Sequence, residues 1–455
     1  MSDPVETDRT AAWADAAAEH LAALVRLPTV SRPDREEQDA EAFAELPRLL
    51  ERLYPRLHAE LEREVVGPGG LLYRWGGASP ARPVVLMAHW DVVPADADAW
   101  QVPPFEGRVD RAAGVVHGRG TLDDKGSMVV VCEAVESLLA EGRAPAHDVY
   151  LSFGCDEEVF GTAAEAAVDA LAARGVRPWL VIDEGGAVVE GVFPGLQRPA
   201  AMIGVAEKGV LDLRIRVEDQ PGHAATPRRG GAVARLARAL HRIERHPFPV
   251  VLTDPSLAMV QTLGRHVTGP LRPLLARAHR ARPAVARALA ALGPETAAVV
   301  RTTVALTRLS GSPAVNVVAA SAEARANIRI QVGETVDGVV ARLRRVVRDE
   351  RVQLEVVSGN DPSPESPSDG PQFALLSRAV EATYPGTVAT PYVMLQASDA
   401  RHFCRISDHV YRFSPFAMSR AQRDSIHGVD EQVDLDSLGR GVAFYRTLLQ
   451  HDDGA

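Results

Sequence analysis

The stretch PVVLMAHWD, residues 83–91, decides the fold class. It begins with a short apolar run rich in β-branched residues, which is typical of a strand buried on both faces of a sheet. The runs DVYLSFG (148–154) and WLVI (179–182) have the same character. Each of the three runs leads directly into polar residues. The pattern predicts three neighbouring strands with candidate functional residues at their ends.

Helical patterns lie between and before these strands. Residues 127–142 form an amphipathic pattern that ends at a glycine, and a second helical pattern covers residues 163–174. Residues 11–26, and more loosely 39–62, also carry helical spacing. Strands that alternate with helices indicate an α/β fold with a mainly parallel sheet.

A different pattern begins near residue 207. Strands with alternating burial and helices follow in the order β-α-β-β-α-β, which suggests a small antiparallel sheet covered by helices on one face. The expected strands are 210–217, 303–309, 323–331 and 352–358, and the expected helices are 231–245 and 336–348. We therefore expect a first domain in two segments, 1–206 and 359–455, interrupted by a ferredoxin-like α+β lid domain, 207–358, with a helical insertion at 247–300.

Composition excludes several classes of protein. The chain has 455 residues, of which 46% are apolar and 24% charged, so it can bury a large core. The net charge of −10 disfavours nucleic-acid binding. No apolar run reaches the roughly 18 residues of a membrane span, and the N-terminus does not resemble a secretory signal. Three widely separated cysteines argue against a disulfide framework, and a cytoplasmic location is expected.

The polar residues after the strands suggest a metal site. In open α/β sheets, ligands bind beyond the carboxyl ends of the strands, so these residues converge on one crevice. Singly, each carboxylate could cap or complement the dipole of the next helix. Together they repel one another and need a cation, and imidazole with carboxylates but no thiolate suits zinc or manganese. The clusters are His89-Trp90-Asp91, Cys155-Asp156-Glu157-Glu158, Asp183-Glu184, and Asp123-Asp124 within GRGTLDDKGS (118–127).

Three rival motifs fail. GRGTLD has two glycines at the spacing of a dinucleotide-binding loop but lacks the third. In DDKGS the lysine and glycine stand in the wrong order for a phosphate-binding loop. The GxSxG motif of serine hydrolases is not found in the sequence.

Six segments in the same order along the chain resemble the signature segments of the di-zinc aminoacylase/carboxypeptidase family, and the DEGG form with the long insertion is most similar to its carboxypeptidase S branch. The segments are HWDVVP (89–94), GRGTLDDKG (118–126), DEEVFG (156–161), LVIDEGG (180–186), PGHAATP (221–227) and IHGVDE (426–431). The resemblance implies two divalent ions, most simply zinc, with cobalt or manganese as alternatives.

The resemblance also implies a role for each site residue. One metal would be held by His89, Asp183 and a bridging Asp123, and the other by Asp123, Glu158 and His427. Glu157 would be the general base, and Asp91 would orient the imidazole of His89. Glu184 is expected to be structural.

In the inserted domain, the resemblance places His223 on the substrate carbonyl. Arg329 would bind the substrate carboxylate, and Asn316 would face the substrate. The roles of Arg401 and His402 stay open.

The implied activity is hydrolysis of an amide bond next to a free carboxylate, in a dipeptide, a small peptide or an N-acyl-amino acid. Two ions would activate water and polarise the carbonyl, and Glu157 would transfer the proton. The alternatives are a dedicated N-acyl-amino-acid hydrolase and, from another class, an inactive metal-binding assembly protein. The partners expected are a small-molecule or short-peptide substrate and a homodimer through the lid domain, with no nucleic acid and no membrane.

Overall fold

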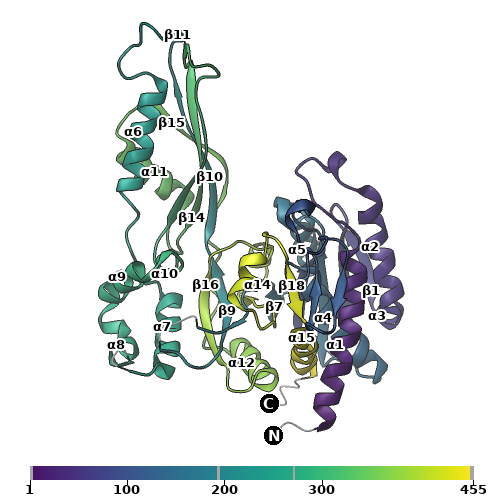
Figure 1. The fold of residues 1–455 in the computed structure, drawn as a ribbon. Coiled ribbons are helices and arrows are strands. Elements are labelled where there is room, and N and C mark those ends of the chain that lie inside the picture. Colours follow the sequence, from purple (N-terminus) through teal and green to yellow (C-terminus); the bar gives the residue numbers. More distant parts are fainter. Residues whose placement is uncertain (1–3, 192–194, 270–271, 451–455) are drawn as a thin grey trace.

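A computed structural model describes residues 4–191, 195–269 and 272–450 and places them in two bodies (Figure 1). The larger body is called the catalytic domain after the activity that the resemblance implies, and the other, which extends away from it, is called the lid. The catalytic domain is built on a nine-stranded sheet with the strand order β1-β2-β6-β3-β7-β17-β9-β16, to which β8 is added beside β9. Strands β6, β3, β7 and β17 run parallel to one another, as the alternating pattern predicts. The strands span Glu62–Val66 (β1), Gly70–Trp75 (β2), Ser79–His89 (β3), His147–Gly154 (β6), Leu180–Asp183 (β7), Val188–Val189 (β8), Ala200–Glu207 (β9), Val388–Met394 (β16) and Val410–Arg412 (β17).

Strand β3 is buried on both faces, which explains its continuous apolar run. Leu86 and Ala88 belong to one hydrophobic cluster with helices α1, α4, α12 and α15, whereas Val85 and Met87 pack on the opposite face with helices α5 and α13. The sheet is therefore sandwiched between two helical layers. The helices of these layers are Pro4–Val25 (α1), Lys125–Ala140 (α4), Ala163–Ala173 (α5), Pro371–Thr383 (α12), Ala400–Phe403 (α13) and Leu435–Gln450 (α15).

Shorter elements complete the catalytic domain. A three-stranded sheet joins the two segments of the chain, because β18 (Gln432–Asp434) pairs with β5 (Val115–His117), which also pairs with β4 (Arg108–Asp110). Helices α2 (Ala40–Leu53) and α3 (Pro55–Glu60) lie at the periphery, and α14 (Arg420–Ser425) lies beside β18. None of the helices in the described ranges is long and apolar enough to cross a membrane.

The lid contains a four-stranded antiparallel sheet with the order β12-β14-β10-β15, and helices α6 and α11 share its hydrophobic core. This order, with β-α-β-β-α-β succession, is that of a ferredoxin-like domain. The elements are Gly209–Glu218 (β10), Ala232–Arg245 (α6), Thr303–Ser310 (β12), Ser321–Ile330 (β14), Val336–Val347 (α11) and Val352–Asn360 (β15). At the far end of the lid, β11 (Gly222–His223) pairs with β13 (Val317–Val318).

The stretch between α6 and β12 forms additional helices with a core of their own. They are Asp254–His266 (α7), Arg272–Ala276 (α8), Arg282–Leu292 (α9) and Pro294–Val299 (α10). Their apolar residues pack with Ala200 of β9 and Val388 of β16, so this insertion packs against the catalytic sheet. We propose the domain segments 1–206, 207–358 and 359–455, with the chain passing between the bodies at Lys208 and just after Asn360.

Candidate metal centre

The end of β3 carries the first imidazole of the centre. His89 is the last residue of the strand and is 2% exposed. Its Nδ1 lies 3.0 Å from the backbone carbonyl oxygen of Asp91. A carbonyl only accepts hydrogen bonds, so Nδ1 donates to it. Nε2, which faces Oδ1 of Asp123, is the nitrogen left for a metal ion.

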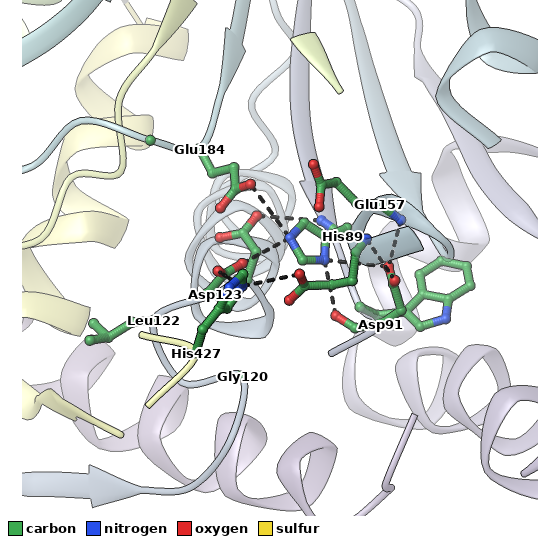
Figure 2. Close-up of polar contacts among 12 residues, drawn as sticks. His89, Asp91, Gly120, Leu122, Asp123, Glu157, Glu184 and His427 are labelled. Atoms are coloured by element: carbon green, nitrogen blue, oxygen red, sulfur yellow. Dashed lines mark hydrogen bonds and ion pairs between the residues drawn. The ribbon is translucent and has the colours of Figure 1, made fainter. Parts of the chain in front are cut away.

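Asp123 lies between two imidazoles (Figure 2). Its Oδ1 is 3.0 Å from Nε2 of His89, and its Oδ2 is 3.0 Å from Nε2 of His427. Nε2 of His427 is also 3.0 Å from Oε2 of Glu158. One carboxylate therefore faces both imidazoles, which is the arrangement of a ligand shared by two ions. The peptide bond between Asp123 and Asp124 is cis.

Two adjacent carboxylates follow strand β7. Oε1 of Glu184 lies 3.5 Å from Nε2 of His89, whereas Oδ2 of Asp183 accepts a hydrogen bond of 2.8 Å from the backbone N–H of Ala400. Ligand atoms of His89, Asp124 and Glu184 lie within 4.8 Å of one another, and so do those of His89, Asp123 and Glu158. The structure thus brings Glu184, which we expected to be structural, into the cluster.

Asp91 connects the first imidazole to the two glutamates that follow β6. Its Oδ1 accepts the backbone N–H of Glu157 and its Oδ2 that of Glu158, each at 3.1 Å. Oδ1 is also 3.4 Å from Nδ1 of His89. Asp91 therefore fixes the turn that carries Glu157 and Glu158 relative to His89 (Figure 2).

The charge balance of the cluster fits bound cations. Burial raises the pKa of Glu157, Glu158 and Glu184. Hydrogen bonds to Asp123 and Glu158 raise the pKa of His427 to about 10. Oε1 of Glu158 and Oδ1 of Asp124 are buried without a hydrogen-bond partner.

Buried carboxylates this close together need positive charge, and unpartnered carboxylate oxygens beside imidazoles are suitable ligands for divalent ions. Of the site residues expected from sequence, the structure brings together His89, Asp91, Asp123, Glu157, Glu158 and His427, with Asp183 at the edge.

The lid residues divide into two groups. Arg329, on β14, is partly buried, and the charges of Glu207 and Glu157 act on its pKa, although burial dominates and lowers it. His223 and Asn316 lie side by side at the lid tip, where the N–H of Ala224 donates to the carbonyl oxygen of Asn316 at 3.1 Å. That tip is exposed and distant from the metal centre of the same chain (Figure 1).

Sequence reasoning missed Asp399, a buried carboxyl whose pKa is raised to about 7 by burial. It lies directly before α13, and β16 is parallel to β9, which runs antiparallel to β17, so the rule for the carboxyl ends of parallel strands does not point to it. The neighbouring Arg401 donates a 2.6 Å hydrogen bond to the carbonyl oxygen of Ser398 and lies over the ring of Phe160. Burial lowers the pKa of His402 to about 4.

Near the carboxyl ends of parallel strands, two imidazoles lie around one carboxylate with a buried glutamate beside them, and this arrangement defines a metal-dependent hydrolase. Comparisons with known proteins agree. Residues 85–451 match the family model described as peptidase family M20/M25/M40. The N-fatty-acyl-amino acid synthase/hydrolase PM20D1 of Xenopus tropicalis is 34% identical over 441 residues, which cover 96% of this chain and 85% of that protein. The probable carboxypeptidase S-like 2 of Dictyostelium discoideum is 31% identical over 444 residues, with 96% and 85% covered.

Solved structures share the fold. Human carnosine dipeptidase 1 has a TM-score of 0.70 at 17% identity, with 99% of this chain and 100% of that chain covered. The di-peptidase Dug1p of Saccharomyces cerevisiae has a TM-score of 0.69 at 16% identity, with 97% and 98% covered. The chain belongs to peptidase family M20/M25/M40 and is a metal-dependent amide hydrolase.

Proposed function

We propose that this enzyme hydrolyses an amide bond next to a free carboxylate, in a dipeptide, a small peptide or an N-acyl-amino acid. The observation that carries the proposal is Arg329. The negative charges of Glu207 and Glu157 act on the pKa of its guanidinium, although burial dominates. Its side chain donates only to Oδ1 of Asn327, at 3.2 Å, and no ion pair is found for it among the described residues. A partly buried guanidinium without a carboxylate partner suits the carboxylate of a substrate.

The residues of the metal centre divide the catalytic work. We propose that His89, Asp123, Glu158 and His427 hold two divalent ions, together with Glu184 or Asp183, and that zinc is the ion bound. Such ions would supply Lewis-acid activation of water and of the amide carbonyl. Glu157 takes the proton of the attacking water and gives it to the leaving amine, for which a buried carboxylate with a raised pKa is suited.

The choice between Glu184 and Asp183 rests on where their oxygens point. Asp183 uses Oδ2 to accept the N–H of Ala400, which fixes the loop after β16. Glu184 directs Oε1 toward Nε2 of His89 and has no comparable backbone partner among the described residues. We therefore favour Glu184 as the ligand beside His89, with Asp183 as the candidate that the sequence resemblance indicates.

The direct test is a hydrolysis screen of dipeptides and N-acyl amino acids with added zinc, cobalt or manganese. Each acid is paired with its C-terminal amide as a matched control. We expect turnover of acids and little turnover of the amides. Equal rates on both would contradict the role of the carboxylate, and no turnover with any metal would contradict the proposed function.

A dedicated N-acyl-amino-acid hydrolase is the second candidate. It is favoured by the relatives described as N-fatty-acyl-amino acid synthase/hydrolases, which match almost the whole chain. The screen separates the two candidates, because a dedicated enzyme would prefer long acyl chains and leave dipeptides uncleaved. We also propose a cytoplasmic location, which is consistent with three unpaired cysteines at separate sites.

We further propose a homodimer in which the lid tip of one chain reaches the metal centre of its partner. The support is the distance of the lid tip from the centre of its own chain (Figure 1). An imidazole N–H from His223 would then stabilise the charge that develops on the carbonyl oxygen. Mixing His223→Ala chains with Glu157→Ala chains should restore part of the activity if subunits exchange. If subunits are shown to exchange but no activity is recovered, the lid would act on the metal centre of its own chain.

A further inference from the structure

The turn that carries His427 is joined to the loop that carries Asp123 by a second carboxylate, Glu431. Oε1 of Glu431 accepts the backbone N–H of Leu122 at 2.8 Å, of Gly120 at 3.1 Å and of Asp123 at 3.3 Å. Glu431 is fully buried. Gly120 and Leu122 border Asp123 in the close-up of the centre (Figure 2). A single oxygen therefore organises the backbone on which the shared ligand sits.

The other carboxylate oxygen of Glu431 and the side chain of Arg119 connect the same two segments. Oε2 lies 2.6 Å from Nη1 of Arg119, and Nη2 of Arg119 donates at 2.7 Å to the carbonyl oxygen of Gly428. The backbone takes part as well, since the N–H of Gly118 donates at 2.9 Å to the carbonyl oxygen of Glu431. These contacts connect residues more than 300 positions apart, from the two segments of the catalytic domain.

Two residues of the His427 turn have an unfavourable backbone conformation with positive φ. His427 has a φ of 58° and Asp430 a φ of 56°, both in the left-handed region that residues with a side chain avoid. Such residues persist where the surrounding structure holds them. Asp430 is held by the N–H and the side-chain amide of Gln101, at 2.8 and 3.0 Å. His427 has its support from the Glu431 and Arg119 contacts on the following residues.

We propose that Glu431 is a positioning residue that holds the Asp123 loop and the His427 turn at the separation their shared ion requires. Rigid placement matters here because Asp123, Glu158 and His427 come from three separate loops, and their ligand atoms meet only if each loop is fixed. Residues behind metal ligands commonly change metal affinity about 10–100-fold when they are replaced. The inference rests on the proposed metal-dependent function and concerns the ion that His427 binds.

The test is metal binding by Glu431→Gln, measured without substrate. The ions retained per chain are counted after equilibration with a graded chelator, and the visible spectrum of the cobalt-substituted protein reports the ligand geometry. We expect the affinity for one of the two ions to fall about 10–100-fold while the other ion is retained. The matched control is Asp430→Asn, which alters a carboxylate of the same turn that contacts Gln101 and not the Asp123 loop; it should bind both ions as the wild type does.

A purely structural role for Glu431 gives a different result. Glu431→Gln would then unfold at a lower temperature in the metal-free state but bind both ions with unchanged affinity and spectrum, and that result would overturn the proposal. If Glu431→Gln does not fold, Glu431→Asp retains the charge on a shorter side chain that cannot reach all three amides. Glu431→Asp should still lower the affinity for one ion, and wild-type affinity for both ions would overturn the proposal. A wild type that binds no metal would instead reject the proposed function.

Discussion

Replacing Glu157 with glutamine tests the general base with little disturbance to the site. The turn is held by the backbone N–H of Glu157 on Asp91, which the substitution leaves in place. The amide has the size of the carboxyl group it replaces but cannot take a proton from water. Metal binding should therefore be unchanged, because no ligand is removed.

The magnitude follows from the work that the residue does. General base catalysis typically contributes about 10²–10⁴ in rate, and Glu157 would transfer a proton twice in each cycle. We expect kcat to fall by at least about 10³, which corresponds to about 4 kcal/mol in the activation barrier. KM should change little. The assay is steady-state kinetics on the best acid from the screen, with metal content measured on the same samples.

A neighbouring carboxylate provides the control. Asp156 accepts the backbone N–H of Thr162 and of Ala163, at 3.0 and 3.1 Å, so its side chain begins helix α5 instead of facing the metals. Asp156→Asn retains an acceptor there and should keep kcat within about tenfold of the wild type. Near-normal kcat in Glu157→Gln, or an equal loss in Asp156→Asn, would refute the assignment of the base.

Three further predictions concern substrate, ligand and pH. Arg329→Ala should reduce kcat/KM for acids at least about tenfold more than for the matched amides, since a charged hydrogen bond is worth about 1.5–3 kcal/mol; equal losses would show that Arg329 does not bind the carboxylate. Glu184→Gln should lower metal content more than Asp183→Asn, and the reverse order would make Asp183 the ligand. In metal-free protein, burial holds the pKa of Asp399 at about 7, above its usual value, so the folded chain binds more protons below that pH and stability falls as pH rises toward 7. Asp399→Asn should flatten this part of the curve of unfolding free energy against pH, and an unchanged slope would contradict the raised pKa.

The catalytic sheet could be read from sequence because its strands are buried on both faces. The run 83–88 has no polar residue to accommodate, since Leu86 packs on one helical layer and Val85 on the other. The lid strands were equally readable for the opposite reason: β14 is buried at alternate positions and shows the two-residue period of a half-exposed strand. Local patterning therefore predicted the central strands β3, β6 and β7 of the catalytic sheet and the strands of the lid sheet.

The centre was only partly readable from sequence. Candidate ligands at or shortly after strand ends, such as His89 and Glu158, follow from the rule for parallel sheets. The rule does not tell which of Asp183 and Glu184 faces the imidazole of His89. That depends on which side chain accepts the N–H of Ala400, a residue more than 200 positions away in the sequence. Glu431 belongs to the same short segment as His427, and its contacts with residues 119–123 form only when the two segments of the chain meet.

A carboxylate shared by two ions is tested by the metal content of Asp123→Asn beside that of the wild type. Both proteins are loaded with zinc, passed over a chelating resin and analysed for zinc per chain and for hydrolysis of the same substrate. Because Asp123 faces both imidazoles, we expect up to two ions and full activity in the wild type, and loss of both ions with loss of activity in the variant. Retention of two tightly bound ions by Asp123→Asn would contradict a carboxylate shared between two metals.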